Sequence, residues 1–185
     1  AILQQLKANN LYAKLEKSEF HLTQVEFLGY VLSPKGISMD QKKVEAISSW
    51  PALNCVKQVQ SFLGFAHFYR RFIKDFSQII TPITKLLKKG AKFIWTSETD
   101  QAFQKLKEKL MLAPILRHPD PSKPFYVEAD ASLLALGGIL SQRNSETGQL
   151  HPVAYYSRKL LPAEQNYPIA HRELLAIKAV FVEWH

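Results

Sequence analysis

The feature that most constrains this chain is a change of hydrophobic period at the proline-rich segment 113–124, APILRHPDPSKP. Before this segment, apolar residues recur at intervals of three and four positions, which is the spacing of one helix face. After it, stretches such as FYVEADAS are strand-like. Because proline fixes φ and has no amide hydrogen, we interpret the segment as a connector between a mainly helical part and a part that contains a sheet.

The helical part is expected to begin with a helix that ends near Asn9-Asn10 and an extended hairpin from Leu22 to Met39 that turns at SPKG. Asp40 is the expected N-cap of the next helix, and Trp50-Pro51 ends it because a residue before proline is disfavoured in a helix. An apolar stripe then predicts a single long helix from Val56 to Phe76.

The second part is expected to be an antiparallel meander with a helix packed on it, so the predicted fold class is mixed α/β (α+β). Ser97 and Asp100 form the expected capping box of a lead-in helix. The predicted strands are FYVEADAS, LALGGILSQ and PVAYYSRKL, and the last of them leads into a final helix. The residues expected to share the apolar face of that helix are Leu174, Ile177, Val180 and Phe181.

The net charge of +8 is unevenly distributed along the chain. Residues 1–120 hold 18 Lys and Arg against 10 Asp and Glu, whereas residues 121–185 hold 6 against 6. A basic surface beside a neutral module suits a polyanionic partner, of which nucleic acid is the commonest. The alternative is a lysine-rich surface that contacts only solvent.

No feature of the sequence indicates secretion or a membrane span. No apolar run approaches the roughly 18 residues that a span requires, and the N-terminus AILQQLKANN lacks the basic-then-apolar layout of a signal peptide. The single cysteine, Cys55, is consistent with a reducing compartment. We therefore expect an intracellular protein, cytoplasmic or nuclear, that is not secreted and has no membrane partner.

Asp130 and Glu173 are the candidate catalytic and metal-binding residues. Strand alternation puts Asp130 on one face with Tyr126 and Glu128, and a helix packed across the sheet would bring Glu173 close to it. Two carboxylates at short range repel each other unless a divalent cation lies between them, and Mg²⁺ with such ligands supports phosphodiester hydrolysis. Two structural interpretations remain open: Asp130 begins a turn with Ser132, and Glu173 is a first-turn acid favoured by the helix dipole.

Several collinear stretches resemble the pol polyprotein of gypsy-class LTR retrotransposons, and together they cover nearly the whole chain. They are EFLGYVLSPKGISMDQKKVEAISSWP, VKQVQSFLGFAHFYRRFIKDFSQIITPITKLLKKG, FIWTSETDQAFQKLKEKLMLAPILRHPDPSKPFYVEADAS and HPVAYYSRKLLPAEQNYPIAHRELLAI. The resemblance implies the end of a reverse transcriptase palm with a primer-grip-like hairpin in residues 1–39 and a helical thumb-like domain in residues 40–90. It further implies a connecting helix and linker in residues 91–124 and the first half of an RNase H-like domain, with a truncated sheet, in residues 125–185.

The resemblance also implies a function for the parent protein, which would copy RNA into DNA and hydrolyse the RNA of RNA–DNA hybrids with Mg²⁺. Asp130 in ADAS and Glu173 in RELLAI match the first two metal-binding carboxylates of the family's ribonuclease H. Other matching positions would bind nucleic acid, near the primer grip or along the primer–template duplex. These positions are Phe27, Leu28, Gly29, Arg70, Arg71 and Lys74.

The sequence departs from the family pattern at several points. It contains no Tyr-x-Asp-Asp motif and no Asp-Asp pair, so this chain alone is not expected to polymerise DNA. The family's third carboxylate, in a Thr-Asp-His stretch, would lie beyond His185, and Ala129 stands where the family usually has threonine. Whether the chain is itself an enzyme is therefore left open.

Two alternatives to an enzymatic role follow from these departures. The chain could be a catalytically inactive retrotransposon-derived remnant that binds nucleic acid through its basic part. It could instead bind a protein partner or a second copy of itself, because a truncated sheet exposes a strand edge that can pair with another chain.

Overall fold

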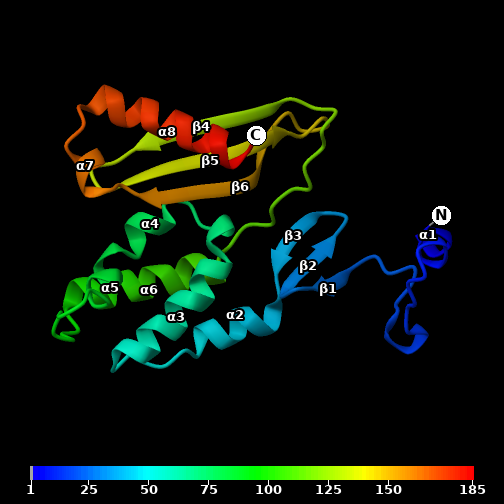
Figure 1. Cartoon of the computed structure of the whole chain (residues 1–185), viewed down its shortest axis with the longest axis horizontal. Coiled ribbons are helices and arrows are strands. Elements are labelled where there is room, and N and C mark those ends of the chain that lie inside the picture. The colour runs from blue at the N-terminus through cyan, green and yellow to red at the C-terminus, as the bar shows by residue number, and fades with distance from the viewer. Residues whose placement is uncertain (1) are drawn as a thin grey trace.

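The computed structural model describes residues 2–185, in which a cluster of helices contacts two separate antiparallel sheets of three strands each (Figure 1). The predicted mixed helix-and-sheet class is confirmed. The first helix, α1 (Ile2–Ala8), lies apart from the rest of the molecule and buries no side chain. No helix within residues 2–185 is both long and apolar enough to span a membrane.

The elements follow one another in an order that separates the two sheets. Sheet A consists of β1 (Val25–Phe27), β2 (Tyr30–Ser33) and β3 (Gly36–Met39). Sheet B consists of β4 (Phe125–Ala131), β5 (Ala135–Arg143) and β6 (Leu150–Lys159). The other helices are α2 (Gln41–Ser48), α3 (Val56–Phe68), α4 (Phe76–Ile79), α5 (Thr81–Lys85), α6 (Ser97–Met111), α7 (Pro162–Gln165) and α8 (Ile169–Glu183), with 3₁₀ turns η1 (Leu15–Lys17) and η2 (Arg70–Phe72).

Sheet A contains one strand more than the hairpin predicted from Leu22 to Met39. Phe27 pairs with Tyr30, so a two-residue turn at Leu28 and Gly29 separates β1 from β2. Both turn residues have positive φ angles, 49° for Leu28 and 79° for Gly29. Two-residue turns with this backbone conformation match the twist of the two strands that they connect. The second predicted turn, at SPKG, is confirmed between β2 and β3.

The long helix predicted from Val56 to Phe76 is wrong, because α3 ends at Phe68. The chain continues through η2 and reaches α4 only after Asp75, whose φ of 58° is left-handed and interrupts any helix. The buried aromatic residues nevertheless continue through this irregular backbone, since Phe72 and Phe76 are each 1% exposed. The apolar spacing therefore identified the buried side chains correctly and the backbone conformation incorrectly.

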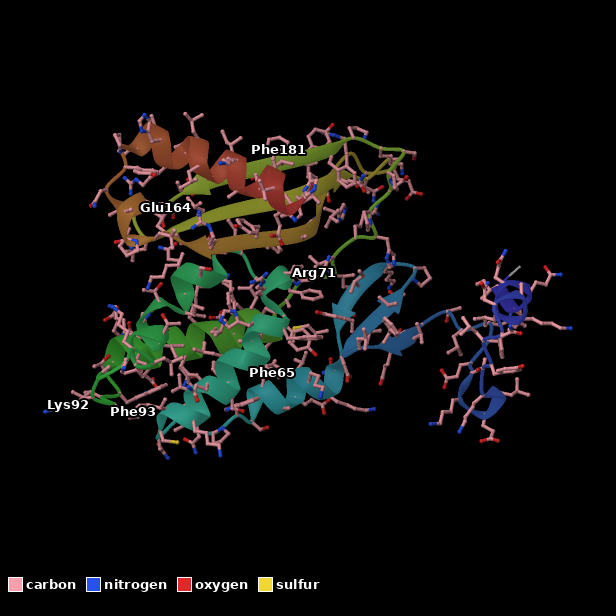
Figure 2. The ribbon with its side chains drawn as sticks, viewed as in Figure 1. Phe65, Arg71, Lys92, Phe93, Glu164 and Phe181 are labelled. Carbon is pink, nitrogen blue, oxygen red and sulfur yellow. The ribbon has the colours of Figure 1, made fainter. Side chains whose placement is uncertain are left out.

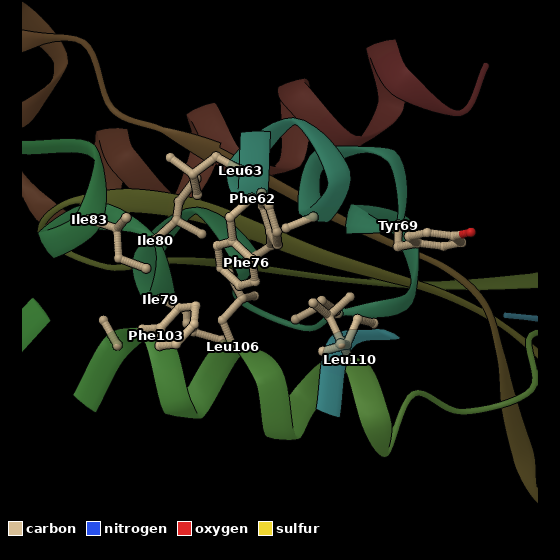
Figure 3. Packing of buried hydrophobic residues seen from close by; sticks show 14 of the residues in the cluster. Phe62, Leu63, Tyr69, Phe76, Ile79, Ile80, Ile83, Phe103, Leu106 and Leu110 are labelled. Carbon is tan, nitrogen blue, oxygen red and sulfur yellow. The ribbon is translucent and has the colours of Figure 1, made fainter. Parts of the chain in front are cut away.

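The helices share one hydrophobic core (Figure 3). Phe62 of α3 and Phe103 of α6 meet edge to face with ring centroids 4.7 Å apart, a geometry that adds about 0.5–1.5 kcal/mol to the burial of the rings. Leu106 and Leu110 continue the buried face of α6 and are fully inaccessible to solvent. Helix α6 thus belongs by its packing to the helical core.

The start of α6 differs by one residue from the capping box predicted at Ser97 and Asp100. The N-cap is Thr96, whose hydroxyl accepts a hydrogen bond from the Thr99 amide at 3.3 Å. The Asp100 carboxylate instead accepts a hydrogen bond from the indole of Trp95 at 3.1 Å. Asp40 caps α2 as predicted and accepts a hydrogen bond from the Lys42 amide.

The predicted meander of sheet B is confirmed, but of the four residues predicted to share the apolar face of its helix only Val180 is buried. Helix α8 packs over β4 and β5 and buries Arg172, Ala176 and Val180, whereas Leu174, Ile177 and Phe181 are exposed. A side chain at Gly138 on β5 would collide with Val180. The small residues Ala176 on α8 and Gly138 on β5 therefore let the helix approach the sheet closely. Because alanine is only weakly hydrophobic, a pattern of large apolar residues does not identify this face as the buried one.

The helical cluster also contacts sheet B on its other face, through η2 and α4, which lie along β6 (Figure 1). The Ser77 amide donates a hydrogen bond to the Ser157 hydroxyl at 3.0 Å, and Tyr155 packs against the helical core. On the same side, an Asp75 oxygen would lie 3.2 Å from a side chain at Gly137. The helical cluster and sheet B therefore pack directly against each other through η2, Asp75 and α4.

The proline-rich segment is more than a connector, because it pairs with sheet A. The amide of Ile37 donates to the Leu116 carbonyl at 2.7 Å, and the amide of Leu116 donates to the Ile37 carbonyl at 2.8 Å. Gly36 makes this approach possible: its φ is +138°, and a Cβ atom there would collide with the Leu116 carbonyl.

We predict that Gly36→Ala lowers the free energy of unfolding by about 1–3 kcal/mol, because alanine meets both the backbone strain and the collision with Leu116. Gly64→Ala is the matched control. Gly64 lies inside α3 with no atom within 4 Å of an added Cβ, so this change should stabilise the chain by about 0.5–1 kcal/mol. Urea denaturation followed by circular dichroism measures the free energy of unfolding of both variants. Equal changes in the two variants would contradict the collision that we assign to position 36.

Candidate functional site

Arg70 and Arg71 lie in η2, at the junction of the helical cluster with sheet B; Figure 2 shows Arg71 at this junction. Both arginines line a groove of 300 Å³ against β6 and the end of α8, which we call the arginine groove. Guanidinium groups bind phosphate oxygens in a forked geometry, and aromatic rings beside them can stack on bases. The other charged or aromatic side chains that line the groove are His67, Phe68, Tyr155, Tyr156, Glu183 and Trp184.

The turn formed by Phe27, Leu28 and Gly29 contacts the end of α3, next to the arginine groove. The Tyr69 hydroxyl donates a hydrogen bond to the Gly29 carbonyl at 2.9 Å, and Tyr30 stacks on Phe68 with ring centroids 5.0 Å apart. Phe27 and Leu28 themselves are 57% and 70% exposed. The structure thus brings the turn close to the arginines, with two apolar side chains available for contact.

Lys74 does not join the arginines, because α3 ends before it and the chain changes direction. It lines a different cavity, of 410 Å³, between α4 and α6. Lys105 and Lys109 share this cavity with the acids Asp75 and Glu98. The three cations predicted to lie along one helix therefore lie on two separate surfaces.

Burial and charge change the titration of two groups in this region. Partial burial of His67, whose ring lies edge-on to Phe76, lowers its pKa, and the positive charge of Arg70 lowers that pKa further. Burial raises the pKa of Tyr30, and the charge of Arg71 opposes that rise. At neutral pH both groups are therefore uncharged, which leaves the arginines as the cations of the groove.

Asp130 lies on the face of sheet B that α4 approaches. It pairs with Gly137 across β5, and its Oδ1 atom accepts a hydrogen bond from the Ala131 amide at 2.9 Å. Its side chain lines a space of only 20 Å³ together with Asp75 and Ser157, which is room for about one water molecule. Asp75 is an acid near Asp130 that the sequence did not indicate.

Glu173 lies in the first turns of α8, which covers the other face of sheet B. Its neighbour Arg172 donates a hydrogen bond to the Ser132 carbonyl at 3.3 Å, so the start of α8 abuts the end of β4. Glu173 does not line the space around Asp130. The structure therefore places the two candidate acids on elements in contact without gathering their carboxylates in one cavity.

The described residues do not form a complete metal site. Within residues 2–185, no group of three or more His, Cys, Asp or Glu side chains is placed to hold an ion. Mg²⁺ is commonly bound by only one or two carboxylates, with water and substrate phosphates as its other ligands. An ion at Asp130 would therefore need a phosphate ligand from bound nucleic acid.

Comparison with known proteins finds a family that matches the second half of the chain and relatives that are similar along nearly all of it. Residues 95–185 match the family described as the RNase H-like domain found in reverse transcriptase. The Tf2-3 and Tf2-4 transposon polyproteins of Schizosaccharomyces pombe are each 38% identical over 183 residues, 99% of this chain. The chain spans 14% of the length of each of these polyproteins.

Solved structures of a foamy viral enzyme share the fold. The protease-reverse transcriptase in complex with an RNA/DNA hybrid has a TM-score of 0.76 and 27% identity, over 92% of this chain and 23% of that one. The complex with double-stranded DNA has a TM-score of 0.77 and 26% identity, over 91% of this chain and 35% of that one. A further foamy viral complex, at 24% identity and a TM-score of 0.81 over 98% of this chain and 32% of that one, agrees in fold.

Sequence reasoning did not show that Trp184 lies in one groove with Arg70 and Arg71, because the walls of the arginine groove come from distant segments. Tyr156 and Trp184 meet edge to face at 6.3 Å on the side of sheet B, more than eighty positions from the arginines. One signal was present: the adjacent run of His67 to Arg71 interleaves basic and aromatic residues, which is typical of nucleic-acid surfaces.

We predict that Arg70→Gln raises the pKa of His67, because loss of a nearby positive charge favours the imidazolium. The pKa should remain below the ordinary histidine value, since burial is the larger cause. The folded chain binds this proton less readily than the unfolded chain, so His67 should reduce stability as the pH falls through the ordinary histidine range. Histidine NMR titration of wild type and variant measures the shift, and a lower pKa in the variant would refute the assigned charge effect.

Proposed function

Residues 95–185 belong to the RNase H-like domain family found in reverse transcriptase, and the whole chain is homologous to retrotransposon polyproteins; from this premise we propose that it binds the nucleic-acid duplex of a reverse transcriptase/ribonuclease H. The parent activity is then RNA-templated DNA synthesis and Mg²⁺-dependent hydrolysis of RNA in RNA–DNA hybrids. Because the chain spans 14% of its relatives, it supplies only part of that machinery.

The observation that carries the proposal is the arginine groove at the junction of the helical cluster and sheet B. Arg70 and Arg71 are exposed cations that form none of the salt bridges found within residues 2–185. Unpaired guanidinium groups beside aromatic rings are suited to a phosphate backbone. Duplex and hybrid complexes of the similar foamy viral enzyme support the choice of partner.

The second part of the proposal concerns metal binding by the acids Asp130 and Glu173. RNase H-like domains of reverse transcriptases generally use divalent metal, and we assign Mg²⁺ to this one, with Asp130 and Glu173 among its ligands. Asp130 and Glu173 would hold such an ion, and its charge would offset the repulsion between these carboxylates and the phosphates of the hybrid. Metal binding at Asp130 is therefore expected to depend on bound hybrid.

Charge removal at the arginine groove tests duplex binding. We expect Arg70→Gln/Arg71→Gln to weaken binding of an RNA–DNA hybrid about tenfold. The variant should also lower the slope of log K against log salt concentration by about 2, because each lost phosphate contact lowers that slope by about 0.9. Lys88→Gln/Lys89→Gln removes the same charge at exposed positions after α5 and should change binding little. Fluorescence anisotropy with a labelled hybrid measures both, and equal losses from the two variants would contradict a specific groove.

Neutralisation of Asp130 tests the metal assignment. Without metal, Asp130→Asn should bind hybrid about two- to threefold more tightly than wild type, because one repulsive charge near phosphate is removed. Added Mg²⁺ should strengthen hybrid binding by wild type and not by the variant. Glu19→Gln, an exposed acid before sheet A, is the charge control.

The same reactions report hydrolysis through an end label on the RNA strand. A product that requires both Mg²⁺ and Asp130 would make the chain an enzyme in its own right. Hybrid binding without product would leave it as a duplex-binding part of one. Mg²⁺ strengthening wild type and Asp130→Asn alike would refute the role of this carboxylate.

A further inference from the structure

Another basic cavity lies between sheet A, the proline-rich segment and the end of β5. It has a volume of 220 Å³. One wall is the turn between β2 and β3, and another is the chain that follows Leu116. The residues with basic side chains that line it are Lys35, Arg117, His118, Lys123 and Arg143.

Hydrogen bonds fix the walls of this cavity to one another. His118 donates from Nε2 to the Ser33 carbonyl at 2.7 Å, which ties the proline-rich segment to the turn. Gln142 is 3% exposed; its Oε1 accepts from the Asp120 amide at 2.9 Å, and its Nε2 donates to the carbonyls of Asp120 and Lys123 at 2.8 and 3.2 Å. The buried Gln142 therefore fixes the segment around Asp120 to β5, and the exposed His118–Ser33 hydrogen bond joins that segment to the turn between β2 and β3.

The positive charge of the cavity is not neutralised by the protein. Asp120 is its one lining acid, and its carboxylate already accepts hydrogen bonds from Ser122 and pairs with Lys123 at 3.3 Å. None of the salt bridges within residues 2–185 involves Lys35, Arg117 or Arg143. Arg143 donates to a backbone carbonyl and lies over an aromatic ring, so its charge also persists. Three uncompensated cations around one cavity favour an anion.

The size of the cavity selects among anions. Small-molecule sites typically measure about 300–1,000 Å³, so 220 Å³ suits a phosphate group better than a whole nucleotide. Arg117 and Arg143 carry the forked donors that bind phosphate oxygens in pairs.

The cavity lies next to the arginine groove along the edge of β6. The Arg117 amide donates to the Pro152 carbonyl at 2.8 Å, and Ala154, two residues further along β6, lines the arginine groove. Two residues of strand measure about 7 Å, at about 3.3 Å each. The edge of one strand therefore connects the two places, so a duplex whose backbone phosphates repeat at about 3.4 Å of axial rise on each strand can contact both.

We propose that this cavity binds a backbone phosphate of the same nucleic-acid duplex that occupies the arginine groove, with Lys35 and Arg117 as its principal cations. The assignment rests on the proposed function and adds a separate contact to it. It makes sheet A and the proline-rich segment part of the nucleic-acid surface.

The test compares Lys35→Gln/Arg117→Gln with wild type, with Arg70→Gln/Arg71→Gln and with the control Lys88→Gln/Lys89→Gln. Anisotropy of a labelled RNA–DNA hybrid is measured between about 50 and 200 mM salt. The cavity variant should lower the salt slope by about 1, the loss of one phosphate contact, and weaken binding about three- to tenfold. Lys35→Gln alone, at an exposed turn residue, replaces the double variant if circular dichroism shows that the latter unfolds.

The outcomes separate the two proposals. Unchanged binding by the cavity variant, with weakened binding by the groove variant, overturns the cavity assignment and leaves the proposed function standing. No hybrid binding by wild type overturns both. NMR titration with inorganic phosphate tests whether the cavity binds a free anion. If phosphate shifts the amide signals of Arg117 and His118 while the cavity variant binds hybrid as wild type does, the cavity binds a free anion. That result overturns the nucleic-acid assignment.

Discussion

The contact of η2 and α4 with β6 determines how the functional surfaces of this chain are arranged. It joins two parts that each have a core of their own, and it is made by the Ser77–Ser157 hydrogen bond and by Tyr155 packed against the helices. Because η2 carries Arg70 and Arg71, this packing sets the arginines against the edge of sheet B. A separation of the two parts would remove one wall of the groove and expose Tyr155.

The same contact shapes the surroundings of Asp130. Asp75, held in a left-handed backbone conformation between η2 and α4, projects toward β5 and lines a small space of 20 Å³ together with Asp130, which itself stays exposed. Asn, Asp and Gly are the residues that adopt this conformation most readily, so the identity of residue 75 has a local explanation in the backbone. Its carboxylate nevertheless adds negative charge on the side of the sheet where a phosphate would have to approach Asp130.

Much of the fold could be predicted from the sequence, because its strands alternate and its turns carry recognisable residues. The meander of sheet B, the cap at Asp40 and the turn at SPKG depend on local preferences and were predicted correctly. The end of α3 could not be predicted from spacing, since Phe72 and Phe76 continue the apolar repeat through backbone that is not helical. Periodicity reports which side chains are buried, and an irregular segment can bury them at a similar spacing.

The candidate site was less accessible to sequence reasoning than the fold. Arg70, Arg71 and the turn at Gly29 were named from the sequence and lie together, but Lys74 departs from them because of a break that no motif announces. Trp184 and Asp75 depend on tertiary packing between distant segments, which a single sequence does not reveal. Strand alternation predicts the face of sheet B on which Asp130 lies, but the sequence does not show that α8, which carries Glu173, packs on the other face.

The adjacent glycines of β5 have a consequence for how this chain can change in evolution. Gly137 admits Asp75 from one face of sheet B, and Gly138 admits Val180 from the other, so the middle of β5 is covered at backbone distance on both sides. A Cβ gained at Gly138 would collide with Val180, whereas one gained at Gly137 would require only a small shift of the Asp75 carboxylate. Substitutions at Gly138 should therefore be accepted only together with a smaller residue at position 180, and substitutions at Gly137 should be constrained less strictly.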